Sequence, residues 1–306
     1  MADRFVHIVD DVPELEGTSP VLVLVMHGFL DAGNASGLAA DHLEAIAGDG
    51  GKVVATFDID AFYDYRARRP ALSFVRDHYE RYDAPRLTVR LMHDAAGASY
   101  LLLRGPEPDT YWEAFARSVR QVMERFEVSK LVTLAGVPMA VPHTRPIAIT
   151  PHATRPDLVR ADNRWQGELR IPSSAQSLME LRLGEWGYDA LGFVAHVPHY
   201  IAQLDYPRAA IALLEELSRT SGLVLTVDAL RADADETEAE IARYLADNDE
   251  VGEVVAGLEQ QYDSFQFVEQ TGTSLLADDG PLPTGEEIGE QFERFLAGLD
   301  SPDDES

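Results

Sequence analysis

The fold is decided by the stretch PVLVLVMHG, residues 20–28. Its apolar residues, Val21–Met26, follow one another without a polar interruption. This pattern predicts a strand that is buried on both faces, which is typical of a parallel sheet covered by helices. A helix predicted over 34–47 and a second strand predicted over 52–58 come next. We interpret the whole segment as a strand–helix–strand unit of an α/β fold.

Strands and helices continue to alternate along the chain. The patterns predict strands over 87–92, 100–103, 130–134, 147–150 and 191–197, and helices over 109–126 and 208–220. Asp109 is expected to cap the helix that begins there, and residues 223–227 are expected to form a last strand or extended segment. Alternation of this kind predicts an open, Rossmann-like sheet between two helical layers, a three-layer α/β/α sandwich. In such sheets ligand sites lie at the carboxyl ends of the strands.

The composition excludes several classes of function. Lys and Arg total 25 against 53 Asp and Glu, so the formal net charge is −28. Such a chain repels nucleic acids and anionic membrane surfaces, and we expect it to bind neither. The absence of cysteine excludes disulfides, thiolate zinc sites and cysteine nucleophiles. The longest apolar run is far shorter than the ~20 residues that span a bilayer, and residues 1–5 do not resemble a secretory signal, so we expect a cytoplasmic protein.

The negative charge is concentrated at one end of the sequence. Residues 232–306 hold 22 acidic residues and two arginines, a net charge of −20, whereas residues 1–231 carry only −8. This asymmetry predicts a sandwich domain over 1–231. An apolar stripe at helical spacing over 251–265 and a final helix beginning at a capping box, TGEE at 284–287, predict an acidic helical extension over 232–298. A disordered acidic tail is expected over 299–306.

The loop after the first predicted strand permits two interpretations. Its His27-Gly28 step is typical of the oxyanion-hole loop of α/β-hydrolases, but the chain has no Gly-x-Ser-x-Gly nucleophile motif, which disfavours a serine hydrolase. The glycine-bearing turn at 31–35 either holds an anion on its N–H groups or is a plain turn capped by Asn34, and we favour the plain turn. No P-loop or dinucleotide-binding fingerprint occurs, and we expect no cofactor.

Histidines and arginines near the predicted strand ends are the remaining candidate site residues. Pro198 lies between His196 and His199, so this pair cannot sit on a regular helix; we expect capping or core hydrogen bonds and no metal site, while proton transfer by His152 or His199 stays open. The arginine-rich segment 64–70 forms either an anionic-ligand site or, as we favour, ion pairs between subunits or within loops. The predicted ligand pocket consists of Asp31, Asn34, Asp60, Arg69, His152 and His199.

Several segments taken in order resemble one family. They are HGFLDAGNA at 27–35, FDID at 57–60 with DYR at 64–66 and RP at 69–70, LAGVP at 134–138, PHAT at 151–154, and AHVPHYIAQ at 195–203 with YP at 206–207. Over residues 5–270 the chain is similar to the actinobacterial branch of the proteasome assembly chaperone 2 family. The resemblance implies a phosphorylase-like α/β/α sandwich and homo-oligomers, with a trimer as the first expectation. Eukaryotic relatives help to assemble the proteasome core particle, whereas actinobacterial members offer no agreed catalytic residues to carry over.

Two functions from different classes remain open. One is a non-enzymatic oligomeric protein that binds protein partners, among them proteasome-related ones. The alternative is a hydrolase or nucleoside-processing enzyme in which the six pocket residues converge in a cleft at the strand ends. We favour the binding protein, because the resemblance supports it and no nucleophile motif supports the enzyme.

Overall fold

The computed structural model describes residues 5–28, 31–48, 50–159, 168–246 and 248–271. The chain divides into two compact units, Met1–Glu259 and Gln260–Ser306, and in the second the described residues are the end of helix α7 (Asp249–Thr271). The predicted final helix and the predicted tail over 299–306 lie outside the described residues. The division into 1–231, 232–298 and 299–306 stays a prediction. Within the described part, no helix combines the length and the apolar character needed to cross a membrane.

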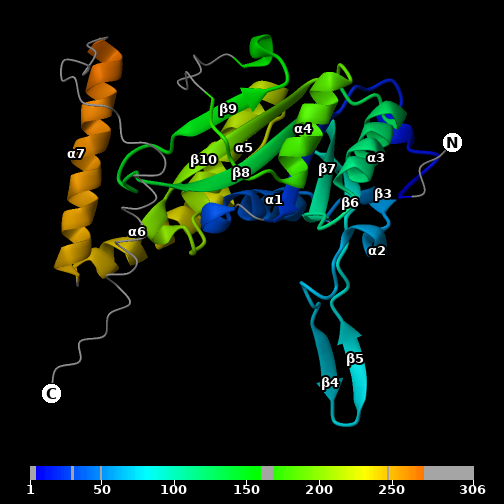
Figure 1. Ribbon diagram of the computed structural model, residues 1–306, viewed down its shortest axis with the longest axis horizontal. Coiled ribbons are helices and arrows are strands. Elements are labelled where there is room, and N and C mark those ends of the chain that lie inside the picture. Colours follow the sequence, from blue (N-terminus) through cyan, green and yellow to red (C-terminus); the bar gives the residue numbers. More distant parts are fainter. Residues whose placement is uncertain (1–4, 29–30, 49, 160–167, 247, 272–306) are drawn as a thin grey trace. The chain divides into compact units, whose positions relative to one another are not determined.

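An eight-stranded sheet forms the middle of the first unit, in the order β1-β3-β6-β7-β2-β8-β10-β9 (Figure 1). Its strands are β1 Val6–Ile8, β2 Val21–His27, β3 Lys52–Phe57, β6 Thr88–His93, β7 Ser99–Pro106, β8 Lys130–Met139, β9 Ile149–Ala153 and β10 Ala190–Pro198. The neighbours β7, β2, β8 and β10 are parallel, whereas β1, β6 and β9 run antiparallel to the strands beside them. The apolar run that decides the fold is β2, which lies between β7 and β8.

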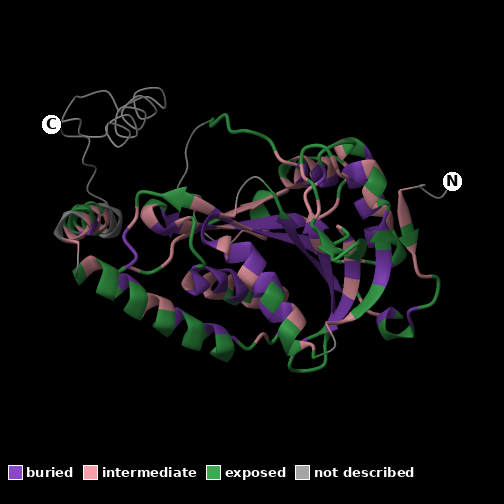
Figure 2. Cartoon of the chain, turned by 90° about the horizontal axis from the view of Figure 1, so that it is seen from below, coloured by how far each residue is buried: buried purple, intermediate pink, exposed green. Residues whose placement is uncertain are grey.

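Helices cover both faces of this sheet and give the expected three layers (Figure 2). One face carries α1 Ala35–Ile46, α5 Pro207–Ser221 and α6 Asp228–Ala246, and the other carries α3 Trp112–Arg125 and α4 Ala175–Glu185. Strand β2 contributes to both cores, because successive side chains of a strand point to opposite faces. Its valines at 21, 23 and 25 enter one apolar cluster, and its residues at 22, 24 and 26 enter the other.

The first strand–helix–strand unit has a wide crossover. Strand β3 runs in the same direction as β2, but β6 and β7 lie between them in the sheet. The chain between β3 and β6 holds the short helix α2 (Ile59–Phe62) and a separate hairpin, β4 Leu72–Val75 and β5 His78–Tyr82. Short 3₁₀ helices occupy Pro13–Leu15, Ala32–Asn34, Pro156–Leu158 and His199–Ile201.

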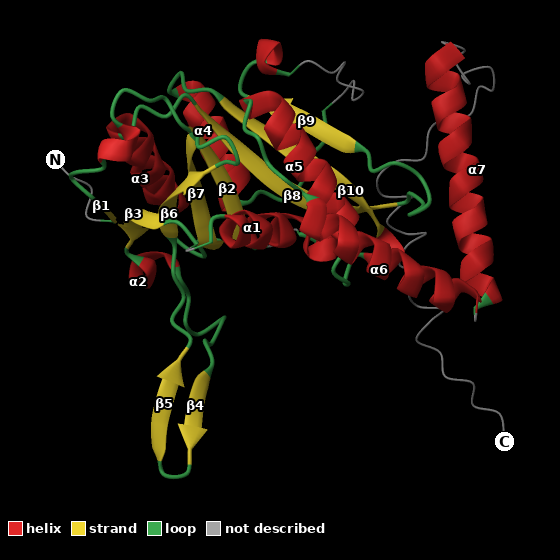
Figure 3. Ribbon diagram, turned by 180° about the vertical axis from the view of Figure 1, so that it is seen from behind, coloured by secondary structure: helices red, strands yellow, loops and turns green. Residues whose placement is uncertain are grey.

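The hairpin of β4 and β5 pairs with no strand of the main sheet, and we call residues 71–84 the arm. Every residue of the arm is exposed, and the arm stands away from the sheet (Figures 1 and 3). The sequence patterns did not predict it, since its turn contains neither glycine nor asparagine, the residues that mark a short hairpin turn. The chain leaves the main sheet at the carboxyl end of β3 to form the arm and rejoins the sheet at the start of the antiparallel β6.

Local structure differs from the sequence-based expectation in a few places. Asp109 does not cap α3; the N-cap is Tyr111, which adopts a φ of 57°. The Asp109 carboxylate instead accepts hydrogen bonds from the guanidinium of Arg68 and from the backbone N–H of Asp64. Residues 223–227, for which a strand was one of the two expectations, form no strand. Helix α4, which begins at a capping box formed by Ser174 and Ser177, was not predicted.

Candidate functional site

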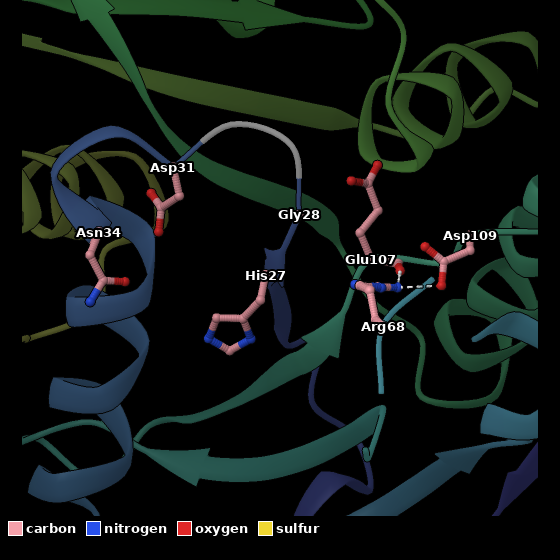
Figure 4. A pocket seen from close by; sticks show the side chains of 7 residues that line it. All are labelled: His27, Gly28, Asp31, Asn34, Arg68, Glu107 and Asp109. Atoms are coloured by element: carbon pink, nitrogen blue, oxygen red, sulfur yellow. Dashed lines mark hydrogen bonds and ion pairs between the residues drawn. The ribbon is translucent and has the colours of Figure 1, made fainter. Parts of the chain in front are cut away.

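The carboxyl ends of β2 and β7 border an open cavity of about 520 Å³ (Figure 4). His27 ends β2, Glu107 directly follows β7, the turn before α1 supplies Asp31 and Asn34, and Arg68 comes from the segment between α2 and the arm. The complete lining is His27, Gly28, Asp31, Asn34, Arg68, Glu107 and Asp109. We call this space the strand-end cavity. It lies at the edge of the sheet where α/β folds place their ligand sites.

Asp31 closes the N-terminal end of α1. Its carboxylate oxygens accept hydrogen bonds from the backbone N–H groups of Ser36 (2.8 Å) and Gly37 (2.9 Å). Asn34 occupies the N-cap position but makes no side-chain cap, and its amide donates to Asp205 (2.9 Å). The turn is therefore capped, but by Asp31 rather than by Asn34 as expected. The N–H groups that an anion would need at this helix end are already occupied.

Glu107 has the same role at the N-terminal end of α4. Its Oε1 accepts a hydrogen bond from the backbone N–H of Ala175, the first residue of the helix (2.7 Å). Gly28 permits this position, because a Cβ at residue 28 would lie 2.2 Å from Oε2 of Glu107. Both helix ends that face the strand-end cavity thus carry a carboxylate of the protein itself. A phosphate group would meet negative charge at each of them.

Arg68 enters the cavity lining as part of an ion pair. Its Nη2 donates to the carboxylate of Asp109 (2.6 Å) and to the backbone carbonyl of Glu107 (2.7 Å), and its guanidinium lies 4.6 Å from the ring centre of Tyr63. Asp109 also accepts the backbone N–H of Asp64 (2.7 Å). At Arg68, the arginine-rich segment therefore makes a loop-anchoring ion pair of the kind that we favoured.

The charge of the strand-end cavity is predominantly negative. Three carboxylates, those of Asp31, Glu107 and Asp109, face a single guanidinium within the lining. A cationic or donor-rich group fits this balance better than an anion. Within the described residues, no group of three or more His, Asp or Glu side chains is placed to hold a metal ion.

Comparison with known proteins assigns the family. The model of the PAC2 family matches residues 25–245. The chain belongs to the PAC2 family. This confirms the resemblance seen in the sequence, and this PAC2 chain has relatives of the expected actinobacterial origin among solved structures. No curated protein matches it.

Three solved structures place this PAC2 chain among its relatives. A Mycobacterium tuberculosis protein of unknown function is 41% identical, with a TM-score of 0.82 over 88% of this chain and 92% of that chain. A Corynebacterium glutamicum protein of unknown function is 31% identical, with a TM-score of 0.80 over 86% of this chain and 98% of that chain. A Mycobacterium tuberculosis proteasome-assembly chaperone homologue is 27% identical, with a TM-score of 0.68 over 77% and 99%.

The structure brings two of the six predicted pocket residues, Asp31 and Asn34, into the strand-end cavity. Asp60 accepts a hydrogen bond from the hydroxyl of Tyr65 (2.6 Å) and, like Arg69, does not line this cavity. A shared ligand role for the six residues stays a prediction.

The two predicted histidines of this PAC2 chain lie outside the strand-end cavity. His152, on β9, places Nδ1 2.8 Å from the carboxylate of Glu180 on α4. His199 follows β10, with Nδ1 3.4 Å from the backbone carbonyl of Met139. Neither ring lines the strand-end cavity, so the enzymatic alternative, which required all six side chains in one cleft, is not favoured.

Sequence reasoning did not select Glu107, although a signal for it exists. Residue 107 directly follows the end of β7, a strand predicted from its apolar residues, and a carboxylate at the carboxyl end of a strand is a candidate for the cavity. Its partner, the first turn of α4, was not predicted, so nothing in the sequence paired the two. Arg68 was noticed only as one arginine among several in its segment.

Proposed function

We propose that this PAC2 chain is a non-enzymatic, homo-oligomeric protein of the cytoplasm that binds proteins as an assembly chaperone does, with a proteasome component as its partner. Family membership and the 27% identical proteasome-assembly chaperone homologue support the class of function. The cavity chemistry is consistent with it, because the carboxylates of Asp31 and Glu107 cap helices rather than flank a nucleophile.

The arm is the observation that carries the proposal. A soluble protein rarely leaves a long hairpin with large apolar side chains in water unless another protein covers it. Leu72, Phe74, Tyr79 and Tyr82 each expose 50% or more of their surface on the arm. An isolated two-stranded hairpin is at best marginally stable. Contact with another protein molecule supplies the missing packing.

A first experiment measures subunit number. Light scattering on the purified full chain is expected to give roughly 100 kDa, three copies of the 33.7 kDa chain. A mass near that of one chain at micromolar concentration would contradict the homo-oligomer.

A second experiment tests the partner. Separate α and β subunits of an actinobacterial proteasome are mixed with and without the protein, and the formation of core particles is followed by native gel over time. We expect the protein to bind free subunits and to change the rate or yield of assembly, and we expect the arm variant Phe74→Ser/Tyr79→Ser to lose the effect. Absence of binding together with an unchanged rate would reject the proteasome component as partner.

A further inference from the structure

The arm has one apolar face. Leu72 pairs with Tyr82 and Phe74 pairs with Tyr79 across the two strands, and directly paired residues lie on the same side of a hairpin. A bulge after Ser73 shifts the register and keeps these four side chains together. Phe74 and Tyr79 are in contact, with ring centres 5.2 Å apart. Their exposed fractions of 61% and 70% show that the arm's own partner strand does not cover them.

The tip of the arm presents a cation. Arg76 lies in the turn between the paired residues Val75 and His78, with a φ of 56°. Among the described residues it is exposed and forms no ion pair. Its neighbour Asp77 is paired with His78, Nδ1 to carboxylate, at 2.9 Å. The guanidinium of Arg76 is therefore the group at the tip that is available to another molecule.

The strand-end cavity has the complementary charge. It is open, it holds about 520 Å³, and its carboxylates outnumber its single guanidinium. It also lies at the edge of the sheet from which the arm leaves, so both features are on one side of the first unit. Carboxylates recognise guanidinium groups through paired hydrogen bonds, and each carboxylate oxygen has more than one lone pair to offer.

We propose that the arm of one copy lies across the strand-end edge of a second copy and places the Arg76 guanidinium in that copy's strand-end cavity, against Asp31 and Glu107. This rests on the homo-oligomer of the proposed function and names the surfaces that meet. Two chains of formal charge −28 repel each other, and an arginine set between carboxylates offsets part of that repulsion at the contact. The cavity is then completed by a residue of the neighbouring copy.

The contact limits the symmetry that the assembly can have. The donor surface is the arm and the receiving surface is the cavity, so the two sides of the interface differ. Such head-to-tail interfaces generate closed rings when the rotation closes. Repeated in one direction, the contact gives the three-membered ring expected for this chain. Reciprocal exchange of arms between two copies would give a two-fold dimer instead, and the mass from light scattering distinguishes the two.

The absence of cysteine makes a direct test possible. Two single variants are made and co-expressed, Asp77→Cys and His27→Cys. Asp77 lies beside Arg76 in the exposed turn of the arm, so this variant keeps the guanidinium. The purified mixture is treated with a short bismaleimide. Residue 27 is exposed and lines the cavity, so we expect cross-linked dimers from the mixture and almost none from either variant alone. The matched control replaces His27→Cys with Glu16→Cys, an exposed residue before the amino end of β2, and is expected to give no cross-link.

The outcomes separate this inference from the proposed function. If light scattering shows an oligomer but the Asp77→Cys and His27→Cys pair does not cross-link, only the docking of the arm in the cavity is overturned. Cross-linking of Asp77→Cys to itself would show arms meeting arms and would also overturn it. Arg76→Glu is expected to raise the dissociation constant of the oligomer at least about tenfold, with Arg76→Lys closer to the wild type. Equal dissociation constants for the three chains would count against the contact.

Discussion

The loops at the ends of the sheet and the arm carry similar polar residues, but these residues are bonded within the chain in the loops and exposed on the arm. At the sheet ends, carboxylates such as Asp31 and Glu107 are bonded to backbone N–H groups of the same chain. On the arm, every residue from 71 to 84 is exposed, and its charged groups pair at most with neighbours on the hairpin, as Asp77 does with His78. The first region stabilises the fold, and the second is available for a partner.

This difference explains why the strand-end cavity is a poor catalytic site. A carboxylate that caps a helix is fixed in place and is occupied by the donors it serves. Substitution in the sheet-end loops should therefore cost the stability of a single chain, whereas substitution on the arm should cost association alone. The following predictions test that division, beginning with the largest effect.

Asp94 has the largest expected effect. Its buried carboxylate accepts backbone N–H groups from Val224 (2.7 Å), Ala98 (2.7 Å) and Ala96 (2.9 Å). Burial favours a raised pKa, but these donors outweigh it and hold the pKa of Asp94 below its ordinary value. Asp94→Ala leaves the donors without an acceptor, and we expect the free energy of unfolding in urea to fall by about 3 kcal/mol.

The matched control for Asp94 is an arm carboxylate. Asp83→Ala removes an exposed side chain and should change the free energy of unfolding by less than about 0.5 kcal/mol. Equal losses for Asp83 and Asp94 would contradict the division between the two regions.

Asp31→Ala has the next largest expected effect. It removes the acceptor for two N–H groups of α1 and a negative charge at the helix N-terminus. We expect a loss of about 2 kcal/mol, measured at high dilution, where the protein is monomeric, as a lower urea midpoint with an unchanged m-value. Asp77→Ala on the arm is the control and should leave the midpoint in place. A wild-type midpoint for Asp31→Ala would mean that another group caps α1.

The fold could be predicted from the sequence because its decisive signals are local. The apolar run of β2 and the helical spacing of α3 and α5 each report burial directly, and the structure confirms them. The order of the strands in the sheet could not be predicted in the same way. That β6 and β7 lie between β2 and β3 depends on how distant segments pair, and periodicity carries no such information.

The candidate site was less predictable for a related reason. Asp31 and Asn34 belong to one turn beside a recognisable strand, so their place at the cavity followed from the strand. Glu107 follows β7, but the N–H group that it accepts belongs to a helix that the patterns missed. His152 pairs with Glu180, a residue 28 positions away along the chain. Polar side chains pair with whatever the tertiary structure brings near, and single-sequence patterns do not report those partners.

A smaller effect is expected from pH through His143. Burial lowers the pKa of His143, the guanidinium of Arg208 lowers it further, and Glu238 and Glu259 oppose the shift. In the unfolded chain the ring titrates near the ordinary value of about 6.5. Between the folded value and about 6.5 the unfolded chain binds more protons, so stability falls as the pH is lowered through this interval, by at most about 1.4 kcal/mol per pH unit.

The variant His143→Gln tests this assignment. The free energy of unfolding is measured at about pH 7.5 and about pH 5.5 for both chains, well above the range in which carboxylates are protonated. The variant should lose less stability than the wild type between the two values, even if it is less stable at both. Identical differences would assign the pH dependence to other groups.

Shortening the arm is expected to have the smallest effect on the stability of one chain. Residues 71–84 are replaced by a short Gly-Ser linker, which removes no buried side chain. At high dilution, where both proteins are monomeric, the free energy of unfolding should differ by less than about 0.5 kcal/mol. At higher concentration the wild type should gain apparent stability by mass action, because association stabilises the folded state, whereas the shortened chain should not. A shortened chain that unfolds earlier at every concentration would show that the arm supports its own fold, and the distinction between the two regions would then fail.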